Sequence, residues 1–148
     1  MIPSTAFLQQ AATAVAVTVP PWGAAAYKIG LIKDAFTPSP SLVKADVVMA
    51  DFTDSDPKDL NETTAKFGID PITGDWLLVL TPPAGGWIWA TPDTVNLPQT
   101  IYGWCLLNTA GTVLLGSDLI DPPVAVTAAL DVVDLGSLVM RLPLIFLQ

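Results

Sequence analysis

The chain has no histidine, a single cysteine, one glutamate and one arginine among its 148 residues. Histidine is the side chain whose charge changes nearest neutral pH, and it is the commonest metal ligand. Its absence removes most hydrolytic triads, zinc sites and proton relays. The remaining residues offer no nucleophile, base and orienting group at a suitable spacing. We therefore predict a protein that is not an enzyme and that carries no catalytic residues, metal or cofactor.

Basic residues are also scarce, since 6 Lys and Arg face 14 Asp and Glu and the formal net charge is -8. A protein that binds nucleic acid neutralises phosphates with Lys and Arg. Nucleic acid and anionic membranes are therefore not expected as partners. No segment reaches the roughly 20 consecutive apolar residues that cross a bilayer. Residues 1–19 lack the basic start of a secretory signal.

Cys105 has no second cysteine with which to form an internal disulfide. It lies in the apolar stretch WCLL at residues 104–107, which favours a buried thiol over a reactive one. A lone cysteine does not indicate whether the protein resides in an oxidising or a reducing compartment.

Apolar residues are abundant instead, at 51% hydrophobic against 14% charged. A chain of this length forms one domain and buries roughly 70% of its unfolded surface. A chain with so few charged residues is unusually apolar for a free monomer, which predicts self-association.

Short apolar runs separated by turn residues follow one another from residue 24 onward. The expected strands lie at residues 24–33, 76–81, 87–90, 101–108, 112–120, 124–130 and 135–147, with a short piece at 65–69. Residues 109–111 fit a hairpin turn with Gly111 at positive φ. Residues 41–50 permit a short helix or an irregular strand. The pattern predicts an all-β fold, an antiparallel β-sandwich or jelly roll with extended terminal arms.

Residues 1–23 differ from the rest because they are rich in Ala, Thr and Val and contain no charged side chain. Such a segment gains little by folding on itself and would be ordered by adding to a sheet. We expect an N-terminal arm or added strand at residues 1–23, on a neighbour's sheet rather than its own. Residues 24–148 form the single β-sandwich domain.

The densest cluster of carboxylates lies in the polar loop at residues 51–62. Calcium prefers several oxygen ligands from flexible segments of this kind. The stretch at residues 51–59 lacks the glycine and the terminal glutamate of an EF-hand loop, and Pro57 stiffens it. A solvated loop is therefore favoured over a weak cation site.

Tryptophan occurs five times, at Trp22, Trp76, Trp87, Trp89 and Trp104. Trp87 and Trp89 share one face of their strand, where they could form a stacking platform for a sugar. Tryptophans inside strands more commonly fill a core or a subunit contact, and we predict that role here.

Four short segments resemble small β-rich virion proteins of tailed bacteriophages, of the capsid decoration or cement type. They are KDAFTPSP at residues 33–40, ADFT at 50–53, PQTIYG at 98–103 and PVAVT at 123–127. The chain departs from that pattern at Ala128 and Ala129, where a glycine turn is usual.

The resemblance implies a protein on the outer capsid surface of the virion that bridges subunits of the major capsid protein. It also implies a homo-oligomer, commonly a trimer. The apolar segments at residues 6–19 and 142–148 would then be contact arms. The predicted interface residues are Phe7, Val15, Val17, Val19, Trp87, Trp89, Leu144 and Phe146. The alternative is a receptor- or carbohydrate-binding module of a phage tail fibre, which requires exposed tryptophans.

Overall fold

The computed structural model describes residues 2–3, 27–60, 64–69, 72–73, 76–82 and 84–142. The strands are β1 Ile2–Pro3, β2 Lys28–Ile32, β3 Lys58–Asp59, β4 Thr64–Ile69, β5 Trp76–Thr81, β6 Trp87–Ala90, β7 Gln99–Leu107, β8 Leu114–Val126, β9 Val132–Leu135 and β10 Leu138–Leu142. A single 3₁₀ turn, η1, spans Lys44–Asp46 in the described residues. All the described strand pairs are antiparallel. The all-β prediction is confirmed, whereas the sandwich or jelly roll stays a prediction.

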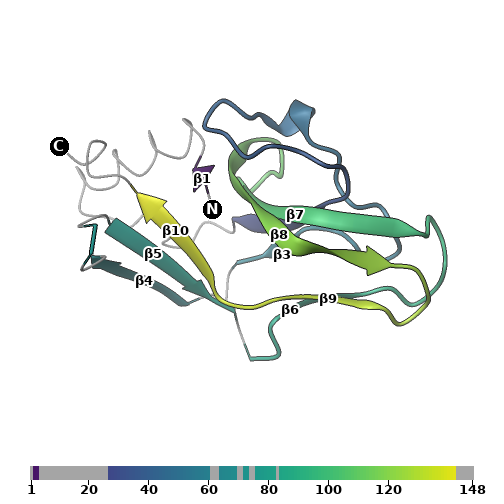
Figure 1. Cartoon of the computed structure of the whole chain (residues 1–148). Helices are drawn as coiled ribbons and strands as arrows, with labels where there is room; N and C mark the ends of the chain where they lie inside the picture. Colours follow the sequence, from purple (N-terminus) through teal and green to yellow (C-terminus); the bar gives the residue numbers. More distant parts are fainter. Residues whose placement is uncertain are drawn as a thin grey trace.

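The strands form a five-stranded sheet in the order β1-β8-β7-β2-β3, a three-stranded sheet β10-β5-β4 and the two-stranded ribbon β6-β9. Figure 1 shows the β6-β9 ribbon running along one face of the β7-β8 pair. Strands β4, β5 and β10 lie together at the left of that view. The main hydrophobic core lies between the large sheet and the ribbon, because both contribute buried side chains to one cluster.

Strand β7 is the centre of the large sheet and is buried on both of its faces. Trp104 and Leu106 belong to the main core, while Cys105 and Leu107 belong to a second cluster on the opposite face. The main core consists of Ile29, Leu31, Phe52, Leu80, Trp87, Trp89, Ile101, Trp104, Leu106, Leu115, Val126, Val133, Leu135 and Leu138. Side chains alternate along β2, since Ile29 and Leu31 face the main core and Ile32 faces the second cluster.

The expected break at residues 121–123 is wrong, because β8 runs from Leu114 to Val126. Ile101 pairs with Val124 and Gly103 pairs with Leu119, so residues 120–123 of β8 stand opposite Tyr102 alone. Proline has no N–H to donate and is tolerated at such irregularities and at sheet edges. The two prolines therefore lie within a bulged strand instead of ending it.

The single strand expected at residues 135–147 is also wrong as predicted. Strand β9 ends at Leu135 and pairs with β6, and β10 begins at Leu138 and pairs with β5. The strands that pair with β10 and β9 are β5 and β6, and these are also separated from each other, by a turn in which Gly85 and Gly86 have φ values of 99° and 79°. The antiparallel ribbon is therefore interrupted in both of its chains at the same place. Residues 143–148 lie outside the described residues.

Two turns close with side-chain hydrogen bonds. The predicted hairpin between β7 and β8 is confirmed, with Gly111 at a φ of 71°. Asn108 Oδ1 accepts the backbone N–H groups of Thr112 and Val113 at 2.8 and 3.0 Å. In the turn before β9, Asp131 Oδ2 accepts the N–H groups of Thr127 and Ala128 at 2.7 and 2.9 Å. Leu130, at a φ of 73°, takes the left-handed conformation that a glycine usually supplies.

Replacing Gly103 by Ala tests the close packing around β7. A Cβ atom at this position would collide with the backbone oxygen of Asp118 and with the ring of Phe36. We expect Gly103→Ala to lower the free energy of unfolding by about 1–3 kcal/mol, measured by chemical denaturation. The matched control is Gly136→Ala, because a Cβ there meets nothing within 4 Å. Equal stability of the two variants would contradict this packing.

Candidate functional site

The four segments that carry the phage resemblance meet at β7. The ring of Phe36, from residues 33–40, lies against Gly103. Asp51, from residues 50–53, accepts a hydrogen bond from Gln99. Residues 123–127 supply the part of β8 that pairs with the start of β7, where Val126 stands opposite Gln99. Segments that are far apart in the sequence therefore form one structural unit.

Asp51 holds this unit together through contacts with Lys33, Asn96 and Gln99. Lys33 Nζ donates to Asp51 Oδ1 at 2.8 Å, and Gln99 Nε2 donates to the same oxygen. Asn96 Nδ2 donates to the backbone oxygen of Asp51 at 2.8 Å. Gln99 Nε2 also donates to the backbone oxygen of Asn96 at 2.8 Å. The end of β2, the loop before β3 and the loop before β7 are thereby fixed to one another.

The pKa of Asp51 is lowered from its ordinary value of 3.8. The hydrogen bond from Lys33 is the largest cause, and the Lys33 charge and the Gln99 hydrogen bond act in the same direction. Partial desolvation opposes them. Because the Asp51 side chain is 54% exposed, solvent screens the ion pair and limits its contribution to stability.

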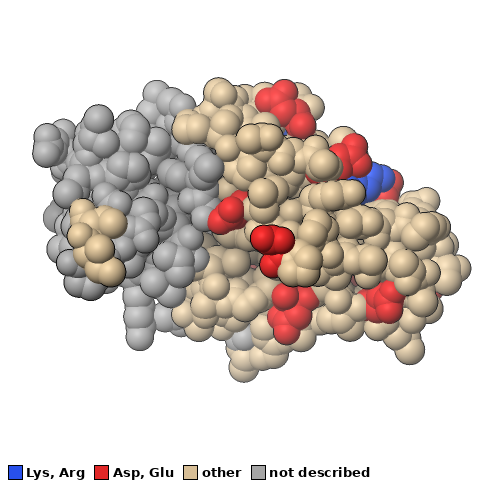
Figure 2. Space-filling model, in the orientation of Figure 1, with Lys and Arg blue, Asp and Glu red and all other residues tan. Residues whose placement is uncertain are grey.

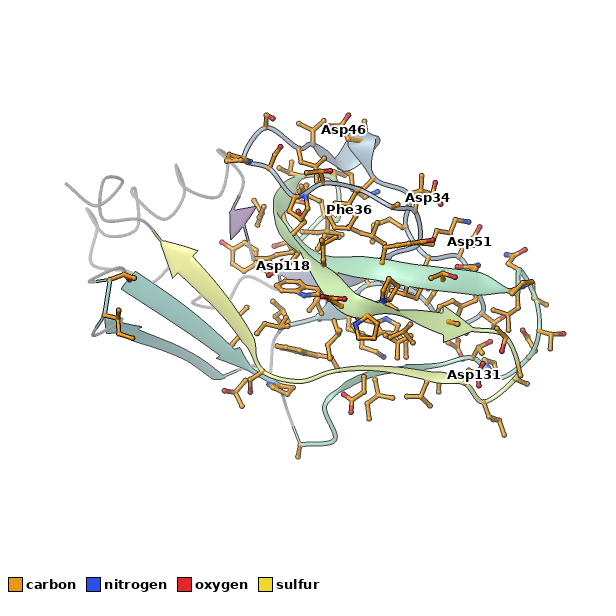
Figure 3. All side chains as sticks on the ribbon, viewed as in Figure 1. Asp34, Phe36, Asp46, Asp51, Asp118 and Asp131 are labelled. Atoms are coloured by element: carbon orange, nitrogen blue, oxygen red, sulfur yellow. The ribbon has the colours of Figure 1, made fainter. Side chains whose placement is uncertain are left out.

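A polar groove opens beside this network. Its lining is Lys33, Asp34, Ala35, Asn96, Pro98, Gln99, Thr100 and Tyr102, and its volume is about 430 Å³. Thr100 and Tyr102 line the groove and alternate with Ile101, which faces the main core. The register shift between Ile101 and Gly103 accounts for Trp104 facing the main core as well. Figure 3 shows Asp34 and Asp51 at the same end of the molecule.

Polar groups dominate the lining of the groove. Its lining offers one ammonium group, one carboxylate, two carboxamides and two hydroxyls. These groups donate and accept hydrogen bonds, but the lining contains no cysteine or histidine to pair as a nucleophile and a base. Sequence reasoning missed this groove because its residues come from two segments that only the sheet brings together.

The acidic loop is more ordered than the sequence predicted. It contains the short strand β3, and Phe52 and Ser55 are buried within it. Two of its carboxylates are paired, Asp51 with Lys33 and Asp59 with Lys28 at 3.3 Å. In the described ranges, no three His, Cys, Asp or Glu side chains are grouped so as to hold a metal ion.

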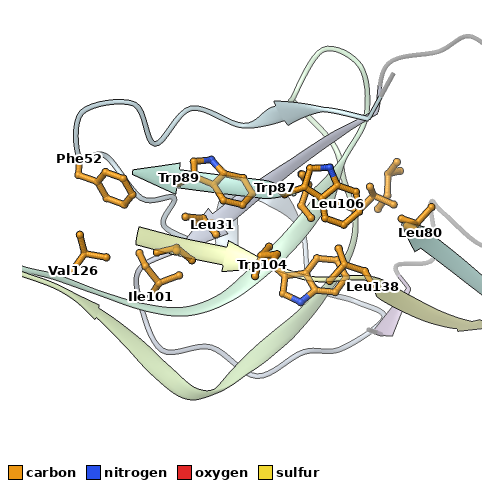
Figure 4. Close-up of a cluster of buried hydrophobic side chains, with 14 residues drawn as sticks. Leu31, Phe52, Leu80, Trp87, Trp89, Ile101, Trp104, Leu106, Val126 and Leu138 are labelled. Atoms are coloured by element: carbon orange, nitrogen blue, oxygen red, sulfur yellow. The ribbon is translucent and has the colours of Figure 1, made fainter. Parts of the chain in front are cut away.

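Three of the five tryptophans belong to the core of this chain. Trp87 and Trp89 are each 1% exposed and Trp104 is 5% exposed. Figure 4 shows their rings among the aliphatic side chains of the main cluster. Trp89 Nε1 donates to the backbone oxygen of Asp56 at 3.0 Å, and Lys58 Nζ lies 5.4 Å from the centroid of the Trp89 ring. The prediction that these tryptophans fill a core is confirmed, and a contact of Trp87 or Trp89 with a second chain stays a prediction.

The other predicted interface residues lie outside the described residues. These are Phe7, Val15, Val17, Val19, Leu144 and Phe146. The described surface nevertheless presents aliphatic side chains, with Ile72 at 92% and Leu130 at 77% exposed. Ile88 and Val132 are exposed on the outer face of the β6-β9 ribbon.

Cys105 is a buried thiol, as the sequence predicted. Burial raises its pKa to about 12, so the reactive thiolate is scarce at neutral pH. The thiol donates a weak hydrogen bond to Met49 Sδ at 3.7 Å.

Acidic side chains outnumber basic ones on the face drawn in Figure 2. Figure 2 shows Asp and Glu side chains spread over the described part of one face, with little Lys or Arg among them. No helix within the described ranges is long and apolar enough to span a membrane.

Comparison with protein-family models, with curated proteins and with solved structures gave no match.

The pH dependence of stability tests the role of Asp51. Since the pKa of its carboxyl is lower in the folded than in the unfolded chain, the stabilisation is present above about pH 4 and is lost as pH falls through the folded pKa. We expect Asp51→Asn to lower the unfolding free energy at pH 7 by about 0.5–1 kcal/mol and to flatten its acid dependence. Denaturant titrations between pH 7 and pH 2 measure both effects.

The control for this measurement is Asp134→Asn, which removes an exposed carboxylate on β9. It should keep the wild-type acid dependence. An Asp51→Asn variant whose stability follows the wild-type pH profile would show that Asp51 is not the titrating group.

Proposed function

We propose that this chain is a non-enzymatic structural protein of a tailed-phage particle, a capsid decoration or cement protein on the outer surface of the head. The observation that carries the proposal is the meeting of the four resembling segments on β7. Residues 33–40, 50–53, 98–103 and 123–127 pack together, so the pattern that carries the resemblance falls on one structural unit.

The proposed mechanism is stabilisation by binding. A protein that binds the assembled lattice of major capsid protein, and not its separate subunits, stabilises the lattice in proportion to occupancy and affinity. Aliphatic side chains such as Leu130 and Val132 on the described surface suit contacts with other chains. The net charge of -8 suits basic patches on the capsid.

The rival function, a carbohydrate- or receptor-binding module built on exposed tryptophans, has less support. Trp87, Trp89 and Trp104 are enclosed by the core and offer no face for stacking. A tail-fibre module would also have no affinity for an empty head, which makes the two functions separable in one experiment.

Light scattering and co-sedimentation test the proposal directly. We expect a trimer in solution that pellets with purified empty heads at physiological salt and raises the temperature at which the heads break apart. The binding should saturate at a fixed ratio to the major capsid protein. A monomer that stays in the supernatant and leaves head stability unchanged would overturn the proposal.

The proposed N-terminal arm has its own test. Replacing Val15, Val17 and Val19 together by Ser removes the apolar side chains that would contact a neighbour. We expect at least a tenfold loss of affinity for heads, since each buried valine contributes about 1.5 kcal/mol or more.

The matched control replaces three exposed valines of the described part, Val43, Val48 and Val113, by Ser. Its affinity for heads should equal that of the wild type. The arm assignment fails if the two triple variants bind heads equally well.

A further inference from the structure

The polar groove has hydrogen-bonding groups that the fold does not use. Within the described part of the chain, the Asp34 carboxylate and the hydroxyls of Thr100 and Tyr102 have no hydrogen-bond partner. All three residues line the groove, whose volume of about 430 Å³ falls in the range of small-ligand sites. A ligand with several hydroxyl groups could satisfy these donors and acceptors together.

One wall of the groove is held in place by the fold. Gln99 is 9% exposed and its carboxamide is held by Asp51 and by the backbone oxygen of Asn96. The Asn96 carboxamide is held by the backbone oxygen of Asp51. Lys33 is held by its ion pair with Asp51. Binding therefore costs these three side chains little additional conformational entropy.

The charges of the lining restrict the ligand. Lys33 and Asp34 are the ionised side chains among the lining residues. Asp51 already pairs with Lys33 at 2.8 Å, so no excess positive charge is available for a phosphate or another anion, and the Asp34 carboxylate is left as a free acceptor. The polar lining is equally unsuited to a purely apolar ligand. A neutral molecule rich in hydroxyl groups fits these groups, because its hydroxyls can donate to Asp34.

Tyr102 adds an aromatic ring to the polar groups that line the groove. Tyr102 is half-buried and lines the groove, and its side chain carries both a ring and a hydroxyl. Apolar C–H faces of a sugar pack on aromatic rings, while sugar hydroxyls pair with carboxylate, hydroxyl and amide groups. The buried tryptophans take no part in this arrangement.

We propose that the groove formed by residues 33–35 and 96–102 is a binding site for a neutral saccharide. Asp34, Thr100 and Tyr102 bond its hydroxyls, and the Tyr102 ring packs against one face of the sugar. This inference is independent of the proposed role in the capsid, because head binding and sugar binding are measured separately.

Two-dimensional amide NMR of the full chain tests the site. The probes are glucose, galactose, mannose, N-acetylglucosamine and their neutral disaccharides, with inorganic phosphate and sialic acid as charged comparisons. We expect at least one neutral sugar to shift the amide signals of residues 33–35 and 96–102 in a saturable manner, and the two anions to leave them unchanged.

Two substitutions identify the contacts. Tyr102→Phe keeps the ring and removes the hydroxyl, so the affinity for the sugar should fall about fivefold. Asp34→Asn removes a charged acceptor, and the affinity should fall about tenfold or more. Asp134→Asn, on the β6-β9 ribbon across the core, should bind as the wild type does. The dispersion of the amide spectrum verifies that each variant is folded.

The proposal is overturned if no neutral sugar in the panel shifts the groove signals, or if the shifts lie elsewhere on the chain. It is also overturned if folded Tyr102→Phe and Asp34→Asn bind sugar as tightly as Asp134→Asn. Saturable shifts of the groove signals by phosphate or sialic acid alone would assign the site to anions instead.

Discussion

The rest of the structure depends on the burial of β7 on both of its faces. A strand covered on both sides needs side chains that fit two clusters, and β7 supplies Trp104 and Leu106 to one and Cys105 and Leu107 to the other. Its two neighbours, β2 and β8, are fixed by pairing with it. At Gly103 even one additional carbon atom would collide with β8 and with Phe36. The placement of the loops follows from this strand, because they pack against residues that its register determines.

The hydrogen bonds of Asp51 fix the loops on the surface beside β7 relative to one another. Lys33 follows β2, Gln99 opens β7 and Asn96 precedes it, and all three bond to Asp51. Hydrogen bonds among partly exposed groups contribute modestly to stability, but they fix the directions of the side chains around them. The groove beside the network is therefore polar, and one of its walls is held in place by these bonds. The proposed sugar site uses the remaining polar groups of the lining, and the proposed role on the capsid does not depend on them.

Local patterns were sufficient to predict some of the fold. The β7-β8 hairpin was predicted because Gly111 and the flanking apolar runs are neighbours in sequence. The burial of Trp87 and Trp89 was predicted because tryptophans inside strands commonly fill a core. The bulge opposite Tyr102 and the break between β9 and β10 could not be predicted, because they depend on how each strand pairs with its partner, which the local apolar pattern does not specify. The Asp51 network was missed for the same reason, since Asp51 and Gln99 are 48 positions apart.

The central claim is that this chain is a stoichiometric component of a phage head, and the most direct test is quantitative mass spectrometry of purified virions. The chain and the major capsid protein would be quantified in intact particles and in heads separated from tails. The account predicts that the chain is present in a fixed ratio to the major capsid protein and stays with the heads. Its absence from purified particles, or its presence in a few copies that separate with the tails, would contradict the account.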